Sequence, residues 1–140
     1  MKWLVIALAC LLAAPAMAQG KAGPSTAMTP TPDERAKQWL ILVDDKNYAD
    51  ALNQMAARAR GKSNGDQWIA KEQSTREPLG AMSSRTLKDV KLTKILPGMR
   101  DGQYATVRYD SAFARKAVAV ESVTLVSENG AWSVIDYFIN

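Results

Sequence analysis

The sequence contains no histidine, and its single cysteine, Cys10, lies within the first eighteen residues. The absence of imidazole excludes Ser-His triads and histidine-based zinc sites. Beyond Cys10 the chain can form no disulfide and no catalytic thiolate. A glycine-rich phosphate loop and a Ser-x-x-Lys motif are also missing. An enzyme made from this chain would have to rely on Asp, Glu, Lys or Tyr, and we predict no catalytic residues, no cofactor and no metal.

Charge of either sign is modest as well. Lys and Arg number 18 against 14 Asp and Glu, a formal net charge of +4, and the basic residues are scattered. A nucleic-acid-binding surface needs a basic stripe with aromatic residues among the charges, which this sequence does not have. We therefore predict no nucleic-acid partner.

The first eighteen residues follow the three-part pattern of an export signal. Lys2 is followed by an apolar run over 3–12 and by the small-residue cleavage pattern at 16–18. The run is shorter than the ~20 residues that span a bilayer, and Cys10 lies too early in it for a lipoprotein signal. We predict a signal peptide over 1–18, a mature start near Gln19, and a periplasmic or secreted protein that is not attached to the membrane.

The 122 residues that remain after removal of the signal suit one domain. Residues 19–30 are rich in Gly, Pro, Ala, Ser and Thr and are predicted to be a flexible linker, so the domain occupies 31–140. The stretch Thr31-Pro32-Asp33-Glu34 is a helix start, with Thr31 as cap, Pro32 at the first helical position and Glu34 completing a capping box.

Two further helices are predicted over 48–59 and 66–77, from apolar residues at helical spacing. Gly61 and Pro78 end them. The acidic stretch 44–47 lacks the ligand pattern of an EF-hand and is interpreted as the break after the first helix.

The rest of the chain reads as antiparallel strands. Residues 85–96 form a weak edge strand, and 104–139 form two hairpins, the second turning at Asn129-Gly130, the strongest short-range hairpin signal. Helices followed by strands indicate an α+β fold, which we predict as three N-terminal helices packed on a curved four-stranded antiparallel sheet.

Register follows from the two turns. A turn at Asn129-Gly130 pairs Glu128 with Ala131 and Val126 with Ser133, and a turn at Arg115-Lys116 pairs Arg108 with Val123. The face predicted to lie beneath the helices carries Val107, Tyr109, Phe113, Val118, Val120, Val126, Ile135, Tyr137 and Ile139. The other face is half apolar and half charged, and carries Trp132, Val134, Phe138, Val123, Leu125, Arg108, Asp110, Glu121 and Asp136.

The half-apolar face supplies the first candidate binding residues. In this register Glu121 lies diagonal to Asp136, with Arg108 one strand away. Two carboxylates in a partly apolar cavity can have their pKa values driven apart, as in acid/base pairs. The alternative is a solvent-facing ion pair with Arg108 and no chemistry.

Three further residues are candidates, each with a structural alternative. Arg76 and Arg85 flank the turn 78–80 and either clamp an anionic ligand or bond the carbonyls that end the third helix. Trp132, with Trp39 and Trp68, forms either a ligand cage or part of the core. Trp132 and Phe138 together are also a possible homodimer contact.

An ordered series of short motifs resembles the domain of unknown function family 4019, a set of small exported bacterial proteins. The motifs include Trp39-Leu40, Val43-Asp44, Gln67-Trp68, Arg76-Glu77-Pro78-Leu79-Gly80, Ser84-Arg85, Leu96-Pro97-Gly98, Asp101-Gly102-Gln103-Tyr104, Glu121-Ser122-Val123-Thr124-Leu125, Gly130-Ala131-Trp132-Ser133-Val134 and Tyr137-Phe138-Ile139. The resemblance implies a compact α+β domain of the cystatin-like or NTF2-like kind and implies no activity. Two positions depart from the family pattern. Asp136 stands where that pattern has a glycine, and Met99-Arg100 stands where it usually has a small residue and a proline.

The functional expectation is an exported, non-enzymatic domain that binds an unidentified small molecule or an envelope protein through the half-apolar sheet face. The rival expectation is an NTF2-like enzyme, with Asp136 or Glu121 as the base and Tyr109 or Tyr137 as a hydrogen-bond donor. In the predicted register these tyrosines lie on the opposite sheet face from the carboxylates.

Overall fold

The computed structural model describes residues 28–62 and 64–140. The predicted signal peptide over 1–18, and the linker apart from its last residues, lie outside the described residues. Among the described helices, none has both the length and the apolar character needed to cross a membrane.

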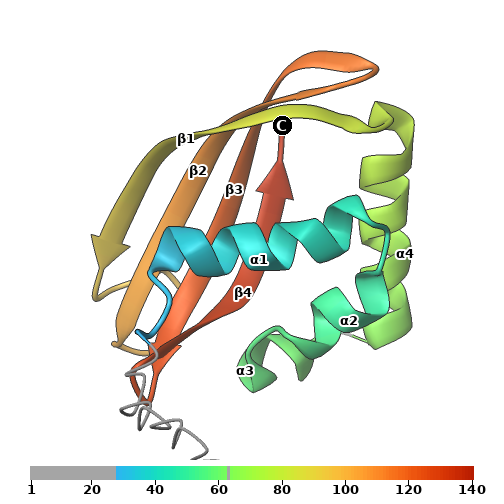
Figure 1. The fold of residues 1–140 in the computed structure, drawn as a ribbon. Coiled ribbons are helices and arrows are strands. Elements are labelled where there is room, and N and C mark those ends of the chain that lie inside the picture. Colours follow the sequence, from blue (N-terminus) through green and yellow to red (C-terminus); the bar gives the residue numbers. More distant parts are fainter. Residues whose placement is uncertain (1–27, 63) are drawn as a thin grey trace, which may run out of the picture.

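The described chain is an α+β domain in which helices precede an antiparallel sheet of four strands in the order β1-β2-β3-β4 (Figure 1). The predicted α+β class and the four-stranded antiparallel sheet are therefore confirmed, but the described chain has four α-helices before the sheet and not the three that were predicted. The elements are α1 (Pro32–Asp44), α2 (Tyr48–Asn53), α3 (Ala57–Arg60), α4 (Gly65–Arg76), the 3-10 turn η1 (Glu77–Leu79), β1 (Met82–Thr93), β2 (Gln103–Phe113), β3 (Lys116–Glu128) and β4 (Ala131–Ile139).

Helix α1 begins and ends as its sequence predicts. Pro32 occupies the first turn, and the Thr31 N–H donates to Glu34 Oε2 at 2.8 Å, which satisfies a donor that the helix itself cannot. The acidic break after Asp44 is a turn, as predicted, and Asn47 then caps α2 by accepting a hydrogen bond from the N–H of Asp50.

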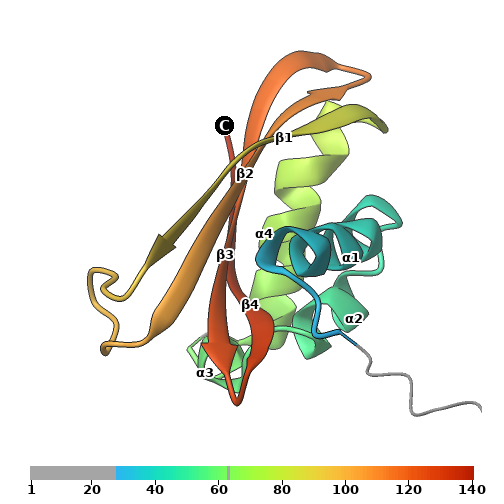
Figure 2. The same ribbon diagram turned by 60° about the vertical axis from the view of Figure 1, so that its left-hand side comes forward.

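The prediction of one continuous helix over 48–59 is wrong. The segment is divided into α2 and α3 at Met55, which forms a parallel bridge with Val134, while the Ala56 N–H donates to the Val134 carbonyl at 2.8 Å. The backbone of this segment thus satisfies the edge of β4 instead of continuing the helix. The chain crosses the β4 edge here, so that α3 lies on the other side of the sheet from α1 and α2 (Figure 2).

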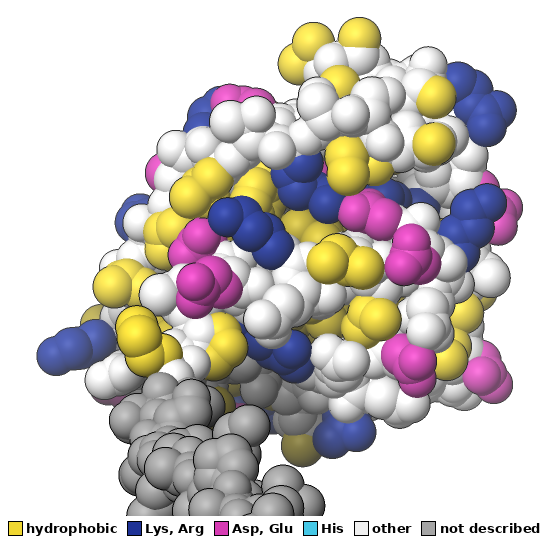
Figure 3. All heavy atoms as spheres, viewed as in Figure 1, with side chains coloured by type: hydrophobic (Ala, Val, Ile, Leu, Met, Phe, Trp, Pro, Cys, Tyr) yellow, Lys and Arg dark blue, Asp and Glu magenta, His cyan; other side chains and the backbone are white. Residues whose placement is uncertain are grey.

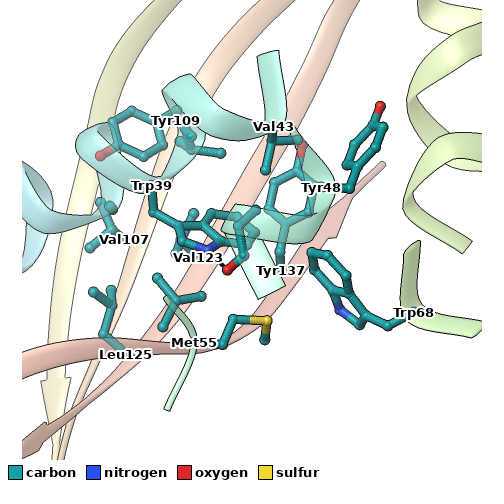
Figure 4. Packing of buried hydrophobic residues seen from close by; sticks show 14 residues of the cluster. Trp39, Val43, Tyr48, Met55, Trp68, Val107, Tyr109, Val123, Leu125 and Tyr137 are labelled. Atoms are coloured by element: carbon teal, nitrogen blue, oxygen red, sulfur yellow. Dashed lines mark hydrogen bonds between the residues drawn. The ribbon is translucent and has the colours of Figure 1, made fainter. Parts of the chain in front are cut away.

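Trp39 stands at the centre of the main core (Figure 4). Its indole Nε1 donates to the Ala51 carbonyl at 2.8 Å, which ties α1 to α2. Its ring makes edge contacts with Trp68, centroids 6.2 Å apart, and with Tyr137, centroids 5.5 Å apart. These geometries favour aromatic packing, and the core role predicted as the alternative for Trp39 and Trp68 is confirmed.

The predicted register of β3 is wrong by one residue. The turn is at Ala114-Arg115, so that Phe113 pairs with Lys116. An irregularity between Ser111 and Phe113 then shifts the ladder by one residue, and Val107 pairs with Val123. A shift of one residue sends every side chain to the opposite face. Glu121, Val123 and Leu125 therefore lie beneath the helices, whereas Val118, predicted to be buried, is 81% exposed.

The register of β4 begins as predicted and then changes. Glu128 pairs with Ala131 and Val126 with Ser133, but a bulge at Ile135 makes Thr124 pair with Asp136 and Val123 with Tyr137. A bulge adds one residue to one strand and moves the following side chains. Val134 and Tyr137 both face the helices as a result, while Ile139 is only half buried.

We call the sheet face opposite α1, α2 and α4 the open face. Most of it carries no helix, but α3 and the β1–β2 connection cover one end, where Ala56, Tyr104 and Val126 form a second apolar cluster with Leu96, Met99 and Ile135. The prediction that all helices cover one face is therefore wrong for α3.

The Asn129-Gly130 turn provides a test of the hairpin that organises the sheet. Both residues have positive φ, 52° and 78°, as this turn requires. Replacing Gly130 with alanine places a Cβ in the left-handed region, and we expect the free energy of unfolding to fall by about 1–2 kcal/mol in urea denaturation.

The control is Gly61→Ala at the end of α3, where φ is −74° and an added Cβ meets its nearest neighbour at an ordinary 3.5 Å. Alanine there is expected to leave stability unchanged or slightly raised. Equal losses in both variants would contradict the assigned turn.

Candidate functional site

Two arginines and two carboxylates meet between the helices and the sheet, and we call this group the buried ion cluster. Asp44 is the last residue of α1, Arg76 is the last residue of α4, Arg85 belongs to β1 and Glu121 belongs to β3. Glu121 is fully buried and the other three side chains are at least five-sixths buried. Two positive and two negative charges make the cluster formally neutral.

Arg76 joins the helical layer to the sheet. Its Nη1 donates to Glu121 Oε1 and to the Tyr137 hydroxyl, both at 2.9 Å, and its Nη2 donates to Asp44 Oδ1 at 2.6 Å. Its guanidinium also lies 4.6 Å above the ring of Phe113, within cation–π range.

Arg85 makes four bonds to the same two carboxylates. Its Nε donates to Glu121 Oε2 at 2.6 Å and its Nη2 to Glu121 Oε1 at 3.0 Å. Its Nη1 and Nη2 donate to Asp44 at 2.7 and 2.9 Å. Both pairings are bidentate, the arrangement in which an arginine binds a carboxylate most strongly.

Two hydroxyl groups complete the shell around Glu121. Ser111 Oγ donates to Oε2 at 2.5 Å, and the Tyr137 hydroxyl donates to Oε1 at 2.7 Å. Burial alone would raise the pKa of Glu121, but the bonds from Arg85, Ser111 and Tyr137 outweigh burial and lower it. Burial raises the pKa of Tyr137, and the neighbouring carboxylate adds to that effect. Glu121 is thus held ionised beside a neutral tyrosine.

The same compensation keeps the arginines charged. Burial opposes the charged form of Arg76 and Arg85, yet their pKa values are raised, by Tyr137 and Asp44 for Arg76 and by Asp44 and Glu121 for Arg85. The arginines converge as an anion clamp would, but the anions they hold are the chain's own. The carbonyl of Glu77, near the end of α4, accepts a bond from Arg115 instead.

The other predicted partners of Glu121 lie elsewhere. Arg108 is on the open face and bonds Asp89 on the neighbouring strand. Asp136 is exposed and lies across from Thr124, on the face opposite Glu121. The predicted diagonal pair of Glu121 and Asp136, and the predicted ion pair of Glu121 with Arg108, are therefore wrong.

Trp132 is half buried on the helix side of β4 and packs against the main core. It lines a shallow hollow of about 300 Å³ together with Thr29, Pro30, Arg35 and Gln38. Phe138 is on the open face, so the two aromatic residues proposed as one dimer contact do not share a surface.

Asp136 lines a different cavity, which we call the open-face groove. It has a volume of about 590 Å³, within the range of small-molecule sites. Its floor is the open face at Thr124, Ile135 and Asp136, and it passes the β4 edge to reach α4. Its walls are Met55, Arg58, Ala59, Lys62, Gln67, Trp68, Lys71, Leu96, Pro97 and Met99.

Charge in the groove is predominantly positive. The charged lining residues are three cations, Arg58, Lys62 and Lys71, and one carboxylate, Asp136. Arg58 bonds Glu128 and the Tyr104 hydroxyl, but its Nε is buried without a hydrogen-bond partner. Lys62 Nζ lies 3.3 Å from the sulfur of Met99, a weak acceptor.

One buried carboxylate lies behind this groove. Glu72, on α4 between Trp68 and Arg76, is 2% exposed, and its Oε1 has no hydrogen-bond partner. The Lys71 ammonium is 3.6 Å away, close enough for attraction only. Burial raises the pKa of Glu72, and the charge of Asp136 raises it further.

The described residues offer no group of three or more Asp, Glu, His or Cys side chains that could hold a metal ion. A smaller cavity of about 250 Å³ adjoins the ion cluster at Asp44 and Arg76, with Tyr48 and Lys46 also lining it.

Sequence reasoning missed Ser111 and Tyr137 as partners of Glu121, and it missed Asp44 as the second carboxylate that Arg76 and Arg85 bind. Asp44 was interpreted as helix punctuation. A signal was nevertheless present, because two aspartates at the end of α1, with no basic residue in its last turn, oppose the helix dipole. Residues kept in such an unfavourable place often have a partner elsewhere in the fold.

Glu121→Gln tests the importance of the ion cluster. The substitution preserves shape but leaves two buried arginines with one carboxylate. Breaking a buried pair in this way costs about 3–5 kcal/mol, and we expect a loss of that size in urea denaturation at pH 7. The matched control, Asp89→Asn, removes the exposed partner of Arg108, and little change is expected.

The same variant gives a pH test. Because the folded pKa of Glu121 lies below its unfolded value of about 4.3, its stabilisation is present above that pH and is lost as pH falls through the folded pKa. The acid loss of stability should therefore be shallower in Glu121→Gln than in the unaltered chain. If the stability of the two proteins fell in parallel as the pH was lowered, the pKa of Glu121 would be the same in the folded and unfolded states.

Glu72→Gln has the opposite expectation. A raised folded pKa means that the unaltered chain loses stability as pH rises through that value. We expect the glutamine variant to be more stable by about 1 kcal/mol at pH 8, with the gain shrinking toward about pH 4.3. Glu77→Gln, at the exposed end of the same helix, is the control and should show no gain.

Comparison with solved structures places this fold among known ones. A protein of Campylobacter jejuni, provisionally described as an NTF2-like transpeptidase, superposes with a TM-score of 0.54 at 15% identity. The alignment covers 75% of this chain and 97% of that protein. At this identity the likeness concerns the fold alone, and it supports the NTF2-like architecture expected from the sequence.

No curated protein matches the chain. A protein family described as "Protein of unknown function (DUF4019)" matches residues 35–137. This range includes every residue of the buried ion cluster and all four strands except the last two residues of β4. The match confirms the resemblance read from the short motifs of the sequence, and the chain belongs to this family.

Proposed function

We propose that the domain is an exported, non-enzymatic binding protein whose open-face groove takes a small amphipathic molecule with an anionic group. The observation that carries this proposal is the combination, in one cavity of about 590 Å³, of an apolar lining and a cationic rim. Ligand sites in proteins are typically concave and mostly apolar, with a few polar groups that orient the ligand.

The apolar part of the groove comes from three separate elements. Met55 precedes α3, Trp68 is on α4, and Leu96, Pro97 and Met99 belong to the β1–β2 connection. Leu96 and Met99 also pack against Ile135 in the second apolar cluster. A hydrocarbon chain in the groove would continue this cluster and remove apolar surface from water.

The polar part favours a negatively charged head group. Lys62 forms no ion pair among the described residues, and the buried Nε of Arg58 has an unused N–H. A carboxylate or phosphate could accept from both of these cations. Asp136 is the groove's only acidic lining residue and would direct the anionic group away from β4 and toward α3.

The groove is a better ligand site than the buried ion cluster. Every oxygen of Glu121 already accepts at least two hydrogen bonds, and the side chain has no exposed surface. A ligand in the cavity of about 250 Å³ could touch Arg76, but it could take over the hydrogen bonds of the two arginines only by displacing Asp44 or Glu121. The groove is open to solvent without any such rearrangement.

One feature of the structure favours the rival enzymatic prediction and another argues against it. The observed register places Tyr109 and Tyr137 on the same face as Glu121, as an NTF2-like acid/base site would need. However, a carboxylate whose pKa is lowered and whose oxygens are saturated is a poor base. The neighbour from Campylobacter jejuni is described as a transpeptidase, but acyl transfer needs an activated nucleophile. This chain has no histidine and no cysteine other than Cys10, so the proposal does not include that activity.

Localisation in the periplasm or outside the cell remains a proposal that rests on the export pattern of 1–18. An N-terminal sequence that starts at Gln19 in the protein recovered from the periplasm would support it.

The small-ligand proposal is independent of whether the chain is monomeric or forms homodimers.

The ligand test uses decanoate as the probe, with decanol and decyltrimethylammonium as neutral and cationic controls. We expect the purified protein to bind decanoate most tightly in calorimetry. Lys62→Gln should weaken decanoate binding by about tenfold through the loss of one charged hydrogen bond, and Met99→Glu should abolish it. Lys37→Gln on α1, on the opposite side of the sheet, should change nothing.

Three results would count against the proposal. Equal binding of all three probes would show simple partitioning into apolar surface. An equal loss in Lys62→Gln and Lys37→Gln would show a general charge effect. Absence of decanoate binding at millimolar concentration would leave the groove without its predicted ligand class.

A further inference from the structure

The outer edge of β1 combines three features that no part of the groove or the ion cluster uses. Within residues 28–62 and 64–140, β1 pairs only with β2, and the backbone N–H and C=O groups along its other side have no strand partner there. Apolar side chains lie along this edge on the helix side of the sheet. Lys91 lies along it on the open face, and Lys94 follows the end of the strand.

The apolar side chains form what we call the β1 strip, consisting of Leu87, Val90 and Leu92. Their cross-strand partners, Tyr109, Val107 and Ala105, are all completely buried beneath the helices. Leu87, Val90 and Leu92 are nevertheless 40%, 38% and 66% exposed. Ile95, just beyond the strand, is 69% exposed and extends the strip.

The figures show why this strip is uncovered. The C-terminal half of β1 runs away from the helices, and α1 crosses the sheet without reaching it (Figure 2). Hydrophobic side chains gather on the side of the molecule along which β1 runs (Figure 3). The core surface of the sheet therefore continues past the helices and ends at an unpaired strand.

Charge on this edge is positive. Lys91 faces the open side across from Thr106, and Lys94 follows the strand. Neither lysine forms an ion pair among the described residues, whereas Lys88 and Asp89 are paired with Asp110 and Arg108 on β2. Lys91 and Lys94 are also the lysines nearest in sequence to Leu92 and Ile95, the most exposed side chains of the strip.

We propose that the edge of β1 from Asp89 to Ile95 binds an extended, acidic segment of a partner protein as an added strand. The backbone of such a segment would satisfy the free edge of β1. Alternate apolar side chains would cover Val90 and Leu92, an acidic side chain between them would face Lys91, and Lys94 at the end of the strand would attract a further acidic residue. Directly opposite residues on neighbouring strands are about 5 Å apart, close enough for these contacts.

A second copy of the chain is a poorer occupant of the same edge. Pairing β1 with its own copy would bring Lys88, Lys91 and Lys94 against the same lysines of the other chain. Like charges on paired strands are unfavourable, and lysines on an edge strand are a common protection against such self-pairing. The β1 bulge between Leu87 and Asp89 also interrupts the edge, which leaves the segment from Asp89 onward as the regular part.

The test begins with a selection of random dodecapeptides, displayed on phage, against the purified full chain. We expect enrichment of peptides in which apolar residues alternate with Asp or Glu. A synthetic enriched peptide is then measured by fluorescence anisotropy against the unaltered protein and its variants. Leu92→Lys should weaken binding by about tenfold or more through lost apolar contact and charge at the edge.

Two further variants separate edge binding from general effects. Val118→Lys, at a residue 81% exposed at the start of β3, is the matched control and should bind as the unaltered protein does. The double variant Lys91→Glu and Lys94→Glu should lose the acidic peptide and gain affinity for its analogue with Lys in place of each acid. Because all three positions are exposed, each variant should keep the urea midpoint of the unaltered chain.

The proposal is overturned if no peptide family is enriched, or if the enriched peptides bind Leu92→Lys and the unaltered protein equally. It is also overturned if the double charge reversal leaves the preference for acidic peptides unchanged. Self-association in light scattering that Leu92→Lys abolishes would assign the edge to a second copy of the chain instead.

Discussion

The burial of Glu121 is the interaction on which the rest of the fold depends. A carboxylate with no exposed surface is stable only when its charge is compensated and its oxygens are bonded. Here Arg76, Arg85, Ser111 and Tyr137 supply that compensation. Because each of these residues comes from a different element, Glu121 can be satisfied only when α4, β1, β2 and β4 are all in place around β3.

An apolar side chain at position 121 could fill the same space and, by general experience with buried ion pairs, could even increase stability. An apolar residue at position 121 would not, however, favour one pairing register of β3 over another. β3 has apolar residues on both of its faces: Val118, Val120 and Val126 on one, and Val123 and Leu125 on the other. A slip of one residue would still bury valines, but it would expose Glu121 and leave the two arginines with Asp44 as their only carboxylate. We infer that the ion cluster makes the observed register the favoured one.

This role of Glu121 explains which parts of the structure could be predicted from sequence. The capped start of α1, the positive-φ turn at Asn129-Gly130 and the core aromatics Trp39 and Trp68 are determined by local chemistry or helical periodicity, and were predicted correctly. The face of β3 was not, because the turn before it was placed at Arg115-Lys116, and the rule that charges lie outside gave no reason to doubt a register that turned Glu121 toward solvent. Its partners are between 10 and 45 residues away in the chain, so that no local pattern reveals that the charge is compensated.

The candidate groove could not be predicted for a related reason. It depends on the break between α2 and α3, where the backbone of Met55 and Ala56 joins the edge of β4. The apolar spacing of 48–59 suits one continuous helix, and hydrogen bonding to a distant strand overrides that local preference. The bulge at Ile135, which places Asp136 on the groove floor, is likewise a property of the paired strands and not of either strand alone.

The two recognition surfaces then follow from where the helical layer stops. α1, α2 and α4 cover the sheet at Val107, Val123, Val134 and Tyr137, close to the arginines that bind Glu121. Because the ion cluster fixes the ends of α1 and α4 at this position, the same helices cannot also reach the end of β1 or the open face. The β1 strip and the open-face groove are therefore left uncovered by the arrangement that satisfies the buried charge.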